Sequence, residues 1–263
     1  MRSIRPARVT VAVAACAIAL AQMPFRTYEP MEGAASEAEL PGDFNKKTEF
    51  VLGRLMYPSS GWRGAAWTVD YPRGDRTFAS AIRRLTLVDV RSVEQPVSPD
   101  DGDDIYYWPY LHVGLPTSWH FTDAQSGKIR DYLLRGGFLM VDSFFGTQEW
   151  LGFERGMRQI FPNRDIEDLP DSDPIFHGVF NMEKRIQVGN WHSQRFGRWY
   201  RADGDVPYWR GIRDDHGRVV VAINFNNDLG DSWQLADNPA YPEKFSSMGI
   251  RLGVNYVVYS LTH

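Results

Sequence analysis

The sequence predicts one α/β domain, with a mainly parallel sheet flanked by helices and an antiparallel addition near the C-terminus. From residue 49 onward, short apolar runs alternate with stretches of helical periodicity. Residues 122–141 have the pattern of a helix, a Gly-Gly pair and a buried strand, which is half of a right-handed βαβ crossover. The chain has 263 residues, of which 43% are hydrophobic, so it is long enough to bury a sizeable core.

The first half of this domain is expected to supply three strands and one helix. Apolar runs at 50–57, 88–93 and 110–113 have the length and composition of buried strands. Asp75 is a predicted helix N-cap, because the apolar residues that follow it over 78–85 fall on one helical face.

The middle of the chain carries the clearest local signals. Thr122 and Gln125 have the spacing of a capping box, and Gly136 is placed to end the helix in the left-handed conformation. The apolar run 138–141 then follows as a buried strand. We therefore expect Leu133 and this strand to be almost fully buried.

The second half predicts two further helices, a hairpin and a last helix. One helix is expected to open near Thr147, and a short one follows Asp173, where Asp and Pro stand at the cap and in the first turn. Runs at 209–213 and 218–223 flank a turn sequence and predict the hairpin. The last helix should cover about residues 242–261.

Residues 1–21 have the features of a secretory signal, with a basic start and an uncharged run that ends in Ala-Leu-Ala. The run is too short to span a bilayer comfortably. Two alternatives stay open, an uncleaved anchor and a lipoprotein processed at Cys16. We expect an exported, periplasmic or cell-envelope protein, in which residues 22–48 form a flexible linker to a single domain over 49–263.

Charge and cysteine content exclude several classes of function. The formal net charge is -4, which argues against a nucleic-acid partner. Cys16 is the only cysteine, so a chain processed after residue 21 has no disulfide, no cysteine metal ligand and no thiol nucleophile. The histidines show no His-x-x-x-His or other metal spacing, and we expect no cofactor and no metal site.

Four separated segments stand out as motifs: Trp67–Arg76 before a helix, Leu133–Phe138, Asp173–His177 and Arg251–Tyr256. Together they resemble the bacterial family called domain of unknown function 4159, over roughly residues 49–263. The resemblance implies a flavodoxin-like fold similar to that of class I glutamine amidotransferases. It also implies a place in the cell envelope and association with a MoxR-type ATPase system.

The chemistry of a glutamine amidotransferase is nevertheless excluded. That reaction needs a cysteine at the elbow after a central strand, activated by a nearby histidine. The corresponding turn here carries Asp142 and Ser143 instead. The Gly-x-Ser-x-Gly elbow of serine hydrolases is also unmatched, because Val141 occupies its first glycine position.

Asp142 and Ser143 still follow a predicted strand at its carboxyl end, where ligands bind in doubly wound sheets. A hydrolase could use Asp142 or Ser143 as its reactive group, with His177 as the acid–base group. Asp142 could also orient a ligand or hold a cation. The plainer alternatives are that Asp142 caps a helix or accepts hydrogen bonds from loop amides, and that His177 has a structural role.

Ligand-binding candidates come from two further segments. Arg73 could bind an anion at a helix start, or it could pair with Asp70 and fix the loop. The polar segment 224–233 could bond its own backbone, hold calcium although its register departs from the EF-hand, or recognise a ligand. Its candidate residues are Asn226, Asp228, Asp231 and Trp233.

We expect Asp70, Asp142 and the 226–233 segment to converge on one rim, because connections after parallel strands emerge at the same edge of a sheet. One of three tryptophans, Trp67, Trp108 or Trp233, would supply an apolar wall. This arrangement favours a non-catalytic binding or assembly domain with a degenerate amidotransferase-like cleft, which takes an envelope protein or a small ligand. The alternative is a hydrolase that acts on a sugar or ester.

The signal prediction can be checked directly. The exported protein should begin at Gln22 when its N-terminus is sequenced, because Ala19 and Ala21 supply the cleavage pattern. A mature protein with a diacylated Cys16 would contradict this prediction and would identify a lipoprotein.

Overall fold

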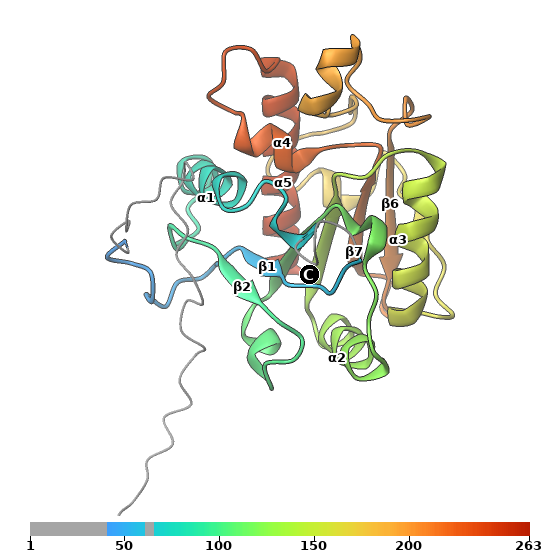
Figure 1. The fold of residues 1–263 in the computed structure, drawn as a ribbon. Coiled ribbons are helices and arrows are strands. Elements are labelled where there is room, and N and C mark those ends of the chain that lie inside the picture. Colours follow the sequence, from blue (N-terminus) through green and yellow to red (C-terminus); the bar gives the residue numbers. More distant parts are fainter. Residues whose placement is uncertain (1–40, 61–65) are drawn as a thin grey trace, which may run out of the picture.

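The computed structural model describes residues 41–60 and 66–263 (Figure 1). The predicted signal at 1–21 and the predicted linker as far as residue 40 lie outside the described residues. Seven strands form one sheet in the order β2-β1-β3-β4-β7-β6-β5. Their bounds are β1 Gly53–Leu55, β2 Gln95–Val97, β3 Tyr110–Gly114, β4 Phe138–Asp142, β5 Glu167–Asp168, β6 Tyr208–Arg213 and β7 Val219–Phe225.

Strands β2, β1, β3, β4 and β7 are parallel, whereas β6 and β5 extend the sheet in antiparallel pairs. Numbered along the chain, the five parallel strands have the order 2-1-3-4-5, which is the flavodoxin-like order. The predicted α/β class and the antiparallel addition near the C-terminus are therefore confirmed. The closer likeness to glutamine amidotransferases stays a prediction.

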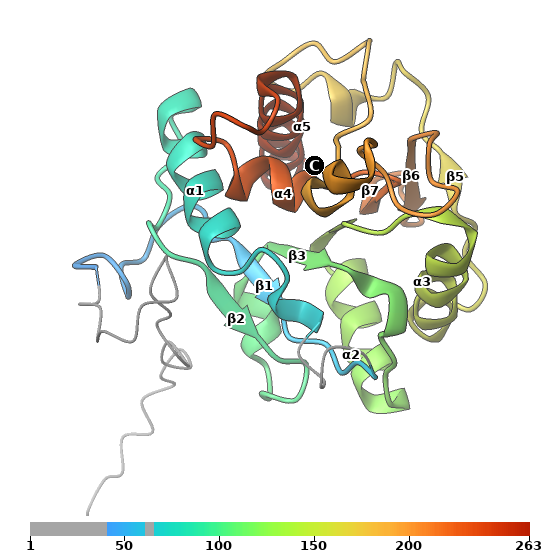
Figure 2. The same ribbon diagram turned by 45° about the horizontal axis from the view of Figure 1, so that its top comes forward.

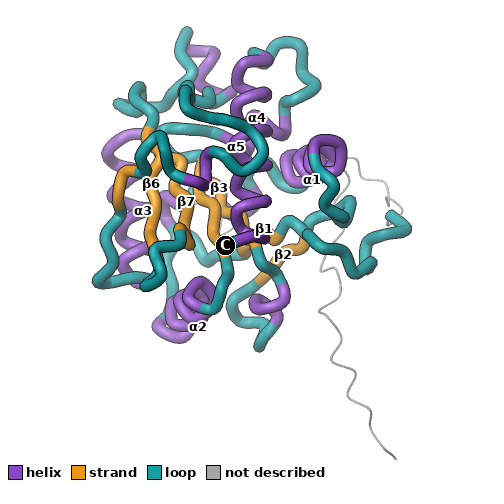
Figure 3. Tube along the Cα trace, turned by 180° about the vertical axis from the view of Figure 1, so that it is seen from behind, coloured by secondary structure: helices purple, strands orange, loops and turns teal. Residues whose placement is uncertain are grey.

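Helices cover both faces of the sheet (Figures 2 and 3). The α-helices are α1 Arg73–Leu85, α2 Asp123–Leu134, α3 Gly146–Ile160, α4 Leu229–Gln234 and α5 Glu243–Thr262, and short 3-10 helices lie at Ala66–Thr68, Asp104–Tyr107, Pro116–Ser118, Pro174–Phe176 and Trp191–Phe196. Helices α2 and α3 share one core with the sheet, and α1, α4 and α5 share the other. Among the described helices, none combines the length and the apolar character needed to cross a membrane.

Strand β4 contributes to both cores, because successive side chains of a strand point to opposite faces of the sheet. Leu139 and Val141 face α2 and α3, whereas Phe138 and Met140 face α1 and α5. All four side chains are at most 1% exposed, as predicted. Asp142 ends the strand on the same side as Phe138 and Met140, so the alternation points its carboxylate toward α1 and α4.

Several local predictions are confirmed. Thr122 Oγ1 accepts a hydrogen bond from Gln125 N (3.2 Å) and Gln125 Oε1 accepts one from Thr122 N (3.0 Å), which completes the capping box. Gly136 has a φ of 117°, the positive value expected after the helix. Asp173 caps its short helix by accepting a hydrogen bond from Ile175 N (3.0 Å).

The predictions for the first strands are only partly right. Pairing in the 50–57 run is limited to β1 and a single bridge between Phe50 and Val90, and the next strand is β2 rather than 88–93. Arg91 explains the shift, because its guanidinium donates hydrogen bonds to the carbonyls of Val93 and Glu94. These contacts fold residues 91–94 into a bend, so pairing with β1 resumes only at Gln95.

Another prediction is wrong. Asp75 is not the N-cap of its helix, because α1 already begins at Arg73 and Asp75 lies buried in the first turn. The segment 224–233 bonds to its own backbone, which is one of the predicted alternatives, and residues 229–234 form α4. Asp228 caps α4 by accepting a hydrogen bond from Asp231 N (3.1 Å).

Residues 41–48, the described part of the predicted linker, contact the domain. Asp43 accepts a hydrogen bond from Ser92 N (2.9 Å) and pairs with Arg83 near the end of α1 (2.6 Å). These contacts lie at the amino-terminal edge of the parallel strands, since residue 92 precedes β2 and Arg83 lies in the last turn of α1.

The packing of α2 gives a test of the fold. Leu133 is fully buried, so Leu133→Ala should lower the free energy of unfolding by about 2–5 kcal/mol in urea denaturation. Its neighbour Leu134 is 43% exposed, and Leu134→Ala should cost less than about 0.5 kcal/mol. Equal losses in the two variants would show that the helix is placed in the wrong register.

Candidate functional site

Acidic side chains from three chain segments converge at the carboxyl ends of the parallel strands, as predicted. Asp142 ends β4, Asp228 and Asp231 lie at the start of α4 after β7, and Asp70 precedes α1. Gly230 N of α4 donates a hydrogen bond to Asp142 Oδ2 (2.8 Å), which ties the β4 end to the α4 turn. The predicted convergence on one rim is therefore confirmed, but Asp142 is fully buried, so it does not line an open cleft as expected.

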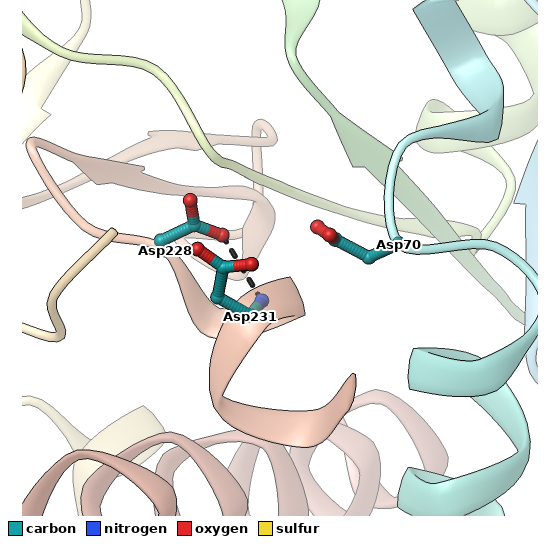
Figure 4. A group of neighbouring side chains, drawn as sticks. All are labelled: Asp70, Asp228 and Asp231. Atoms are coloured by element: carbon teal, nitrogen blue, oxygen red, sulfur yellow. Dashed lines mark hydrogen bonds between the residues drawn. The ribbon is translucent and has the colours of Figure 1, made fainter. Parts of the chain in front are cut away.

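Three of these carboxylates form a cluster, which Figure 4 shows. One oxygen each of Asp70, Asp228 and Asp231 lies within 4.8 Å of the other two. Asp228 and Asp231 are each 2% exposed, and Asp70 is partly buried. Such a set of oxygen donors is typical of sites for hard cations. We call these three residues the acidic cluster.

Neighbouring donors fix the orientation of two of the carboxylates. Ser143 Oγ donates to Asp228 Oδ1 (2.6 Å), and Asn190 Nδ2 donates to Asp228 Oδ2 (2.8 Å). Trp191 N donates to Asp231 Oδ2 (2.7 Å). Hydrogen bonds from outside the cluster therefore hold Asp228 and Asp231 in place, as outer residues do around a metal ligand.

Asp70 is held differently. Within the part of the chain that the structure describes, its carboxylate has no hydrogen-bond partner, and it points toward Asp228 and Asp231 (Figure 4). Its φ of 59° lies in the left-handed region, which costs a non-glycine residue conformational energy. A Cβ on Gly230 would lie 2.3 Å from Asp70 Oδ2, so only glycine at position 230 allows this approach.

Burial and mutual repulsion raise the pKa of every member of the cluster. Loss of hydration is the largest cause for each carboxyl. The Asp228 charge raises the pKa of Asp70 and Asp231 further, and the Asp142 charge does so for Asp228. The pKa values of Asp70 and Asp231 lie well above the ordinary range. Bringing these carboxylates together therefore costs the protein free energy unless a proton or another cation is bound.

A row of buried charged residues adjoins the cluster at Asp142, which contacts Gly230. Arg54 donates to both oxygens of Asp75 (3.0 and 2.5 Å), and His112 Nδ1 lies 3.5 Å from Asp75 Oδ1. His112 Nε2 lies 2.8 Å from Asp142 Oδ1. The arginine holds the pKa of Asp75 below its usual value, against the effect of burial. We call Arg54, Asp75, His112 and Asp142 the polar line.

The chain turns through left-handed residues at the ends of three strands. Leu115, Ser143 and Asn226 directly follow β3, β4 and β7, with φ values of 51°, 60° and 60°. Ser143 therefore lies on a left-handed turn at the end of β4, and the correspondence of this turn to the cysteine elbow of an amidotransferase stays a prediction. Its hydroxyl contacts a carboxylate rather than a histidine.

Other predicted site residues lie outside the cluster. His177 Nε2 lies 2.7 Å from the carbonyl oxygen of Asp171, and neither Asp142 nor Ser143 is its hydrogen-bond partner. Arg73 pairs with Asp237 at 3.0 Å, so the expected Arg73–Asp70 pair is not formed.

The remaining candidates, Asn226 and Trp233, make contacts that stabilise the fold. Asn226 Oδ1 accepts a hydrogen bond from Gly146 N (2.8 Å), at the start of α3. Trp233 is fully buried and stacks on Phe78 with a centroid distance of 4.0 Å. Among the three tryptophans, Trp108 precedes β3 at the opposite edge of the sheet, whereas Trp67 lies in the segment that leads to Asp70.

Sequence reasoning missed Arg54, Asp75 and His112 as a group. The available signal was a charged or ionisable residue inside an apolar strand, which burial makes costly unless it is paired. Arg54 and His112 are direct partners in the β1–β3 register, so both side chains leave the same face of the sheet. Their connection through Asp75 depends on the position of α1, which the strand patterns do not specify.

The fold and the site together define an α/β domain with flavodoxin-like strand order and an acidic cluster at its carboxyl rim. The family model described as Domain of unknown function (DUF4159) matches residues 51–261. The chain belongs to this family, as its four motif segments predicted. A comparison with proteins of curated function finds no match.

The raised pKa values predict how pH affects stability. A carboxyl whose folded-state pKa is raised contributes stability that is present below its unfolded pKa and is lost as pH rises through the folded value. Asp70→Asn removes one such group, and asparagine tolerates the left-handed conformation. This variant should therefore gain about 1 kcal/mol near pH 7.5 and nothing near pH 4, measured by urea denaturation without divalent cations.

The exposed Asp103 provides the control for this experiment. Asp103→Asn should leave the free energy of unfolding unchanged within about 0.5 kcal/mol at both pH values. A loss of stability in Asp70→Asn near pH 7.5 would contradict the account of repulsion in the cluster.

Proposed function

We propose that this chain is an exported binding domain of the cell envelope that holds a divalent cation in the acidic cluster. The observation that carries the proposal is the Asp70 carboxylate, which faces two buried carboxylates and has no hydrogen-bond partner among the described residues. Binding of a cation among the three carboxylates would relieve the repulsion of Asp70 with Asp228 and Asp231.

The ligand type supports a hard cation, and calcium suits the cluster better than magnesium. Calcium accepts flexible arrangements of oxygen atoms, whereas magnesium demands near-ideal octahedral geometry. One oxygen from each of the three carboxylates lies within 4.8 Å of the other two, so a single ion between them would be shared by all three. Three protein carboxylates leave several of its 6–8 positions for water and for a bound molecule.

The contacts of Ser143 and His177 favour binding over catalysis. Ser143 donates its hydroxyl to Asp228, which the proposal places on the cation, and His177 has its own partner in Asp171. The open positions of the cation would accept oxygen atoms of a small ligand or of an envelope protein. The family resemblance adds a MoxR-type ATPase system as a source of such a partner, and the N-terminal sequence supports the envelope location.

The contact between Ser143 and Asp228 is the one observation in favour of the hydrolase alternative. Burial raises the pKa of Asp228, as a general base requires. This alternative would use Asp228 in place of the predicted His177. It predicts covalent labelling of Ser143 by a fluorophosphonate, which the binding proposal does not.

Thermal unfolding in the presence of cations tests the proposed function. The chain from Gln22 onward should unfold several degrees higher with about 5 mM calcium near pH 7.5, because a ligand at 100 times its Kd adds about 2.7 kcal/mol. The shift should be smaller near pH 5, because protons compete for carboxylates with raised pKa values.

Variants assign the effect to the cluster. Asp70→Asn and Asp231→Asn should abolish the calcium-induced shift, and Asp103→Asn should keep it. If calcium, magnesium and manganese all leave the unfolding temperature of the unmodified chain unchanged, the proposal is wrong.

A further inference from the structure

The polar line adjoins the acidic cluster through Gly230 and through the first turn of α1, but it shares no residue with the cluster. Its members are at most 1% exposed, which is unusual for three charged residues and a histidine. Within the described part of the chain, no hydrogen bond joins it to the carboxylates of Asp70, Asp228 or Asp231. The question is what this line does for the acidic cluster.

The sequence places three members of the polar line on one face of the sheet. Arg54 of β1 is the register partner of His112 of β3, and Asp142 of β4 is the partner of Gly114, two residues further along β3. Residues two apart on a strand share a face, so the three side chains form a row on the α1 and α4 side. Asp75 comes from α1 and contacts two members of this row, Arg54 and His112.

Two members of the line, Asp75 and Asp142, hold segments that carry part of the cluster. Asp75 lies in the first turn of α1, and Gly74 N of the same turn donates to the Asp70 carbonyl (2.8 Å). Asp142 Oδ2 accepts from Gly230 N (2.8 Å), and Gly230 lies between Asp228 and Asp231. The line therefore spans the distance between Asp70 and the two aspartates of α4.

We propose that Asp142 and His112 are positioning residues for the cation site. This inference rests on the proposed function. Asp142 is held by His112 and in turn holds the first turn of α4, so it sets where Asp228 and Asp231 stand relative to Asp70. In this role the position of its oxygen atoms matters more than its charge, although it is a carboxylate at the rim.

Two substitutions of Asp142 distinguish the effect of the position of its oxygen atoms from the effect of its charge. Asp142→Asn removes the charge and keeps an oxygen within reach of Gly230 N. Asp142→Glu keeps the charge and moves the carboxylate by one methylene. Positioning predicts calcium affinity within about threefold of the unmodified chain for Asp142→Asn, and a loss of about 10- to 100-fold for Asp142→Glu. Calcium titration calorimetry on the chain from Gln22 onward measures both.

The opposite result would overturn the proposal. If Asp142→Asn loses affinity and Asp142→Glu keeps it, Asp142 acts through its charge, as a calcium ligand or by long-range attraction. If both variants bind as tightly as the unmodified chain, the line has no part in the site. If the unmodified chain does not bind calcium, the proposed function itself fails, which distinguishes the two failures.

Further variants separate positioning from general destabilisation. Tyr132→Phe removes a buried hydrogen bond to the Trp108 carbonyl (2.8 Å) on the other side of the sheet. It should lower the urea midpoint and leave calcium affinity unchanged. Should Asp142→Glu fail to unfold cooperatively, His112→Gln provides the second test, since it removes the ring that holds Asp142. It should weaken calcium binding at least tenfold, and unchanged affinity in it would contradict the proposal.

Discussion

The buried pair of Arg54 and Asp75 is the contact on which the arrangement of the rim depends. A charged residue inside β1 can be buried only if a partner of opposite charge reaches it, and the partner comes from α1. This pairing fixes the first turn of α1 against the sheet, and with it the segment that carries Asp70. It also explains why the helix begins at Arg73, since Asp75 must face inward and cannot serve as a cap.

The sequence predicted the elements whose signals are local. The capping box at Thr122, the α2–β4 succession and the C-terminal hairpin all depend on residues close together in the chain. The rim was also predictable, because connections after parallel strands emerge at one edge. The polar line was not, since it joins β1, α1, β3 and β4. The first strands are shorter than predicted because the Arg91 side chain makes hydrogen bonds to nearby carbonyls. Such hydrogen bonds cannot be predicted from a pattern of apolar residues.

The cluster shows why a search for metal motifs in the sequence finds nothing here. Asp228 and Asp231 lie on one turn, but Asp70 comes from the other half of the chain and reaches them only because position 230 is glycine. The left-handed turn after β4 carries Ser143, whose hydroxyl orients Asp228. This turn therefore supports a carboxylate of the cluster.

The contacts of residues 41–48 determine how the domain is presented to its surroundings. Asp43 forms an ion pair with Arg83 and accepts a hydrogen bond from Ser92 N at the amino-terminal edge of the sheet. The acidic cluster lies at the opposite, carboxyl edge. Anything attached upstream of residue 41 therefore joins the domain on the side opposite the cluster. A tether at that point would therefore hold the domain by the edge that lies away from the acidic cluster.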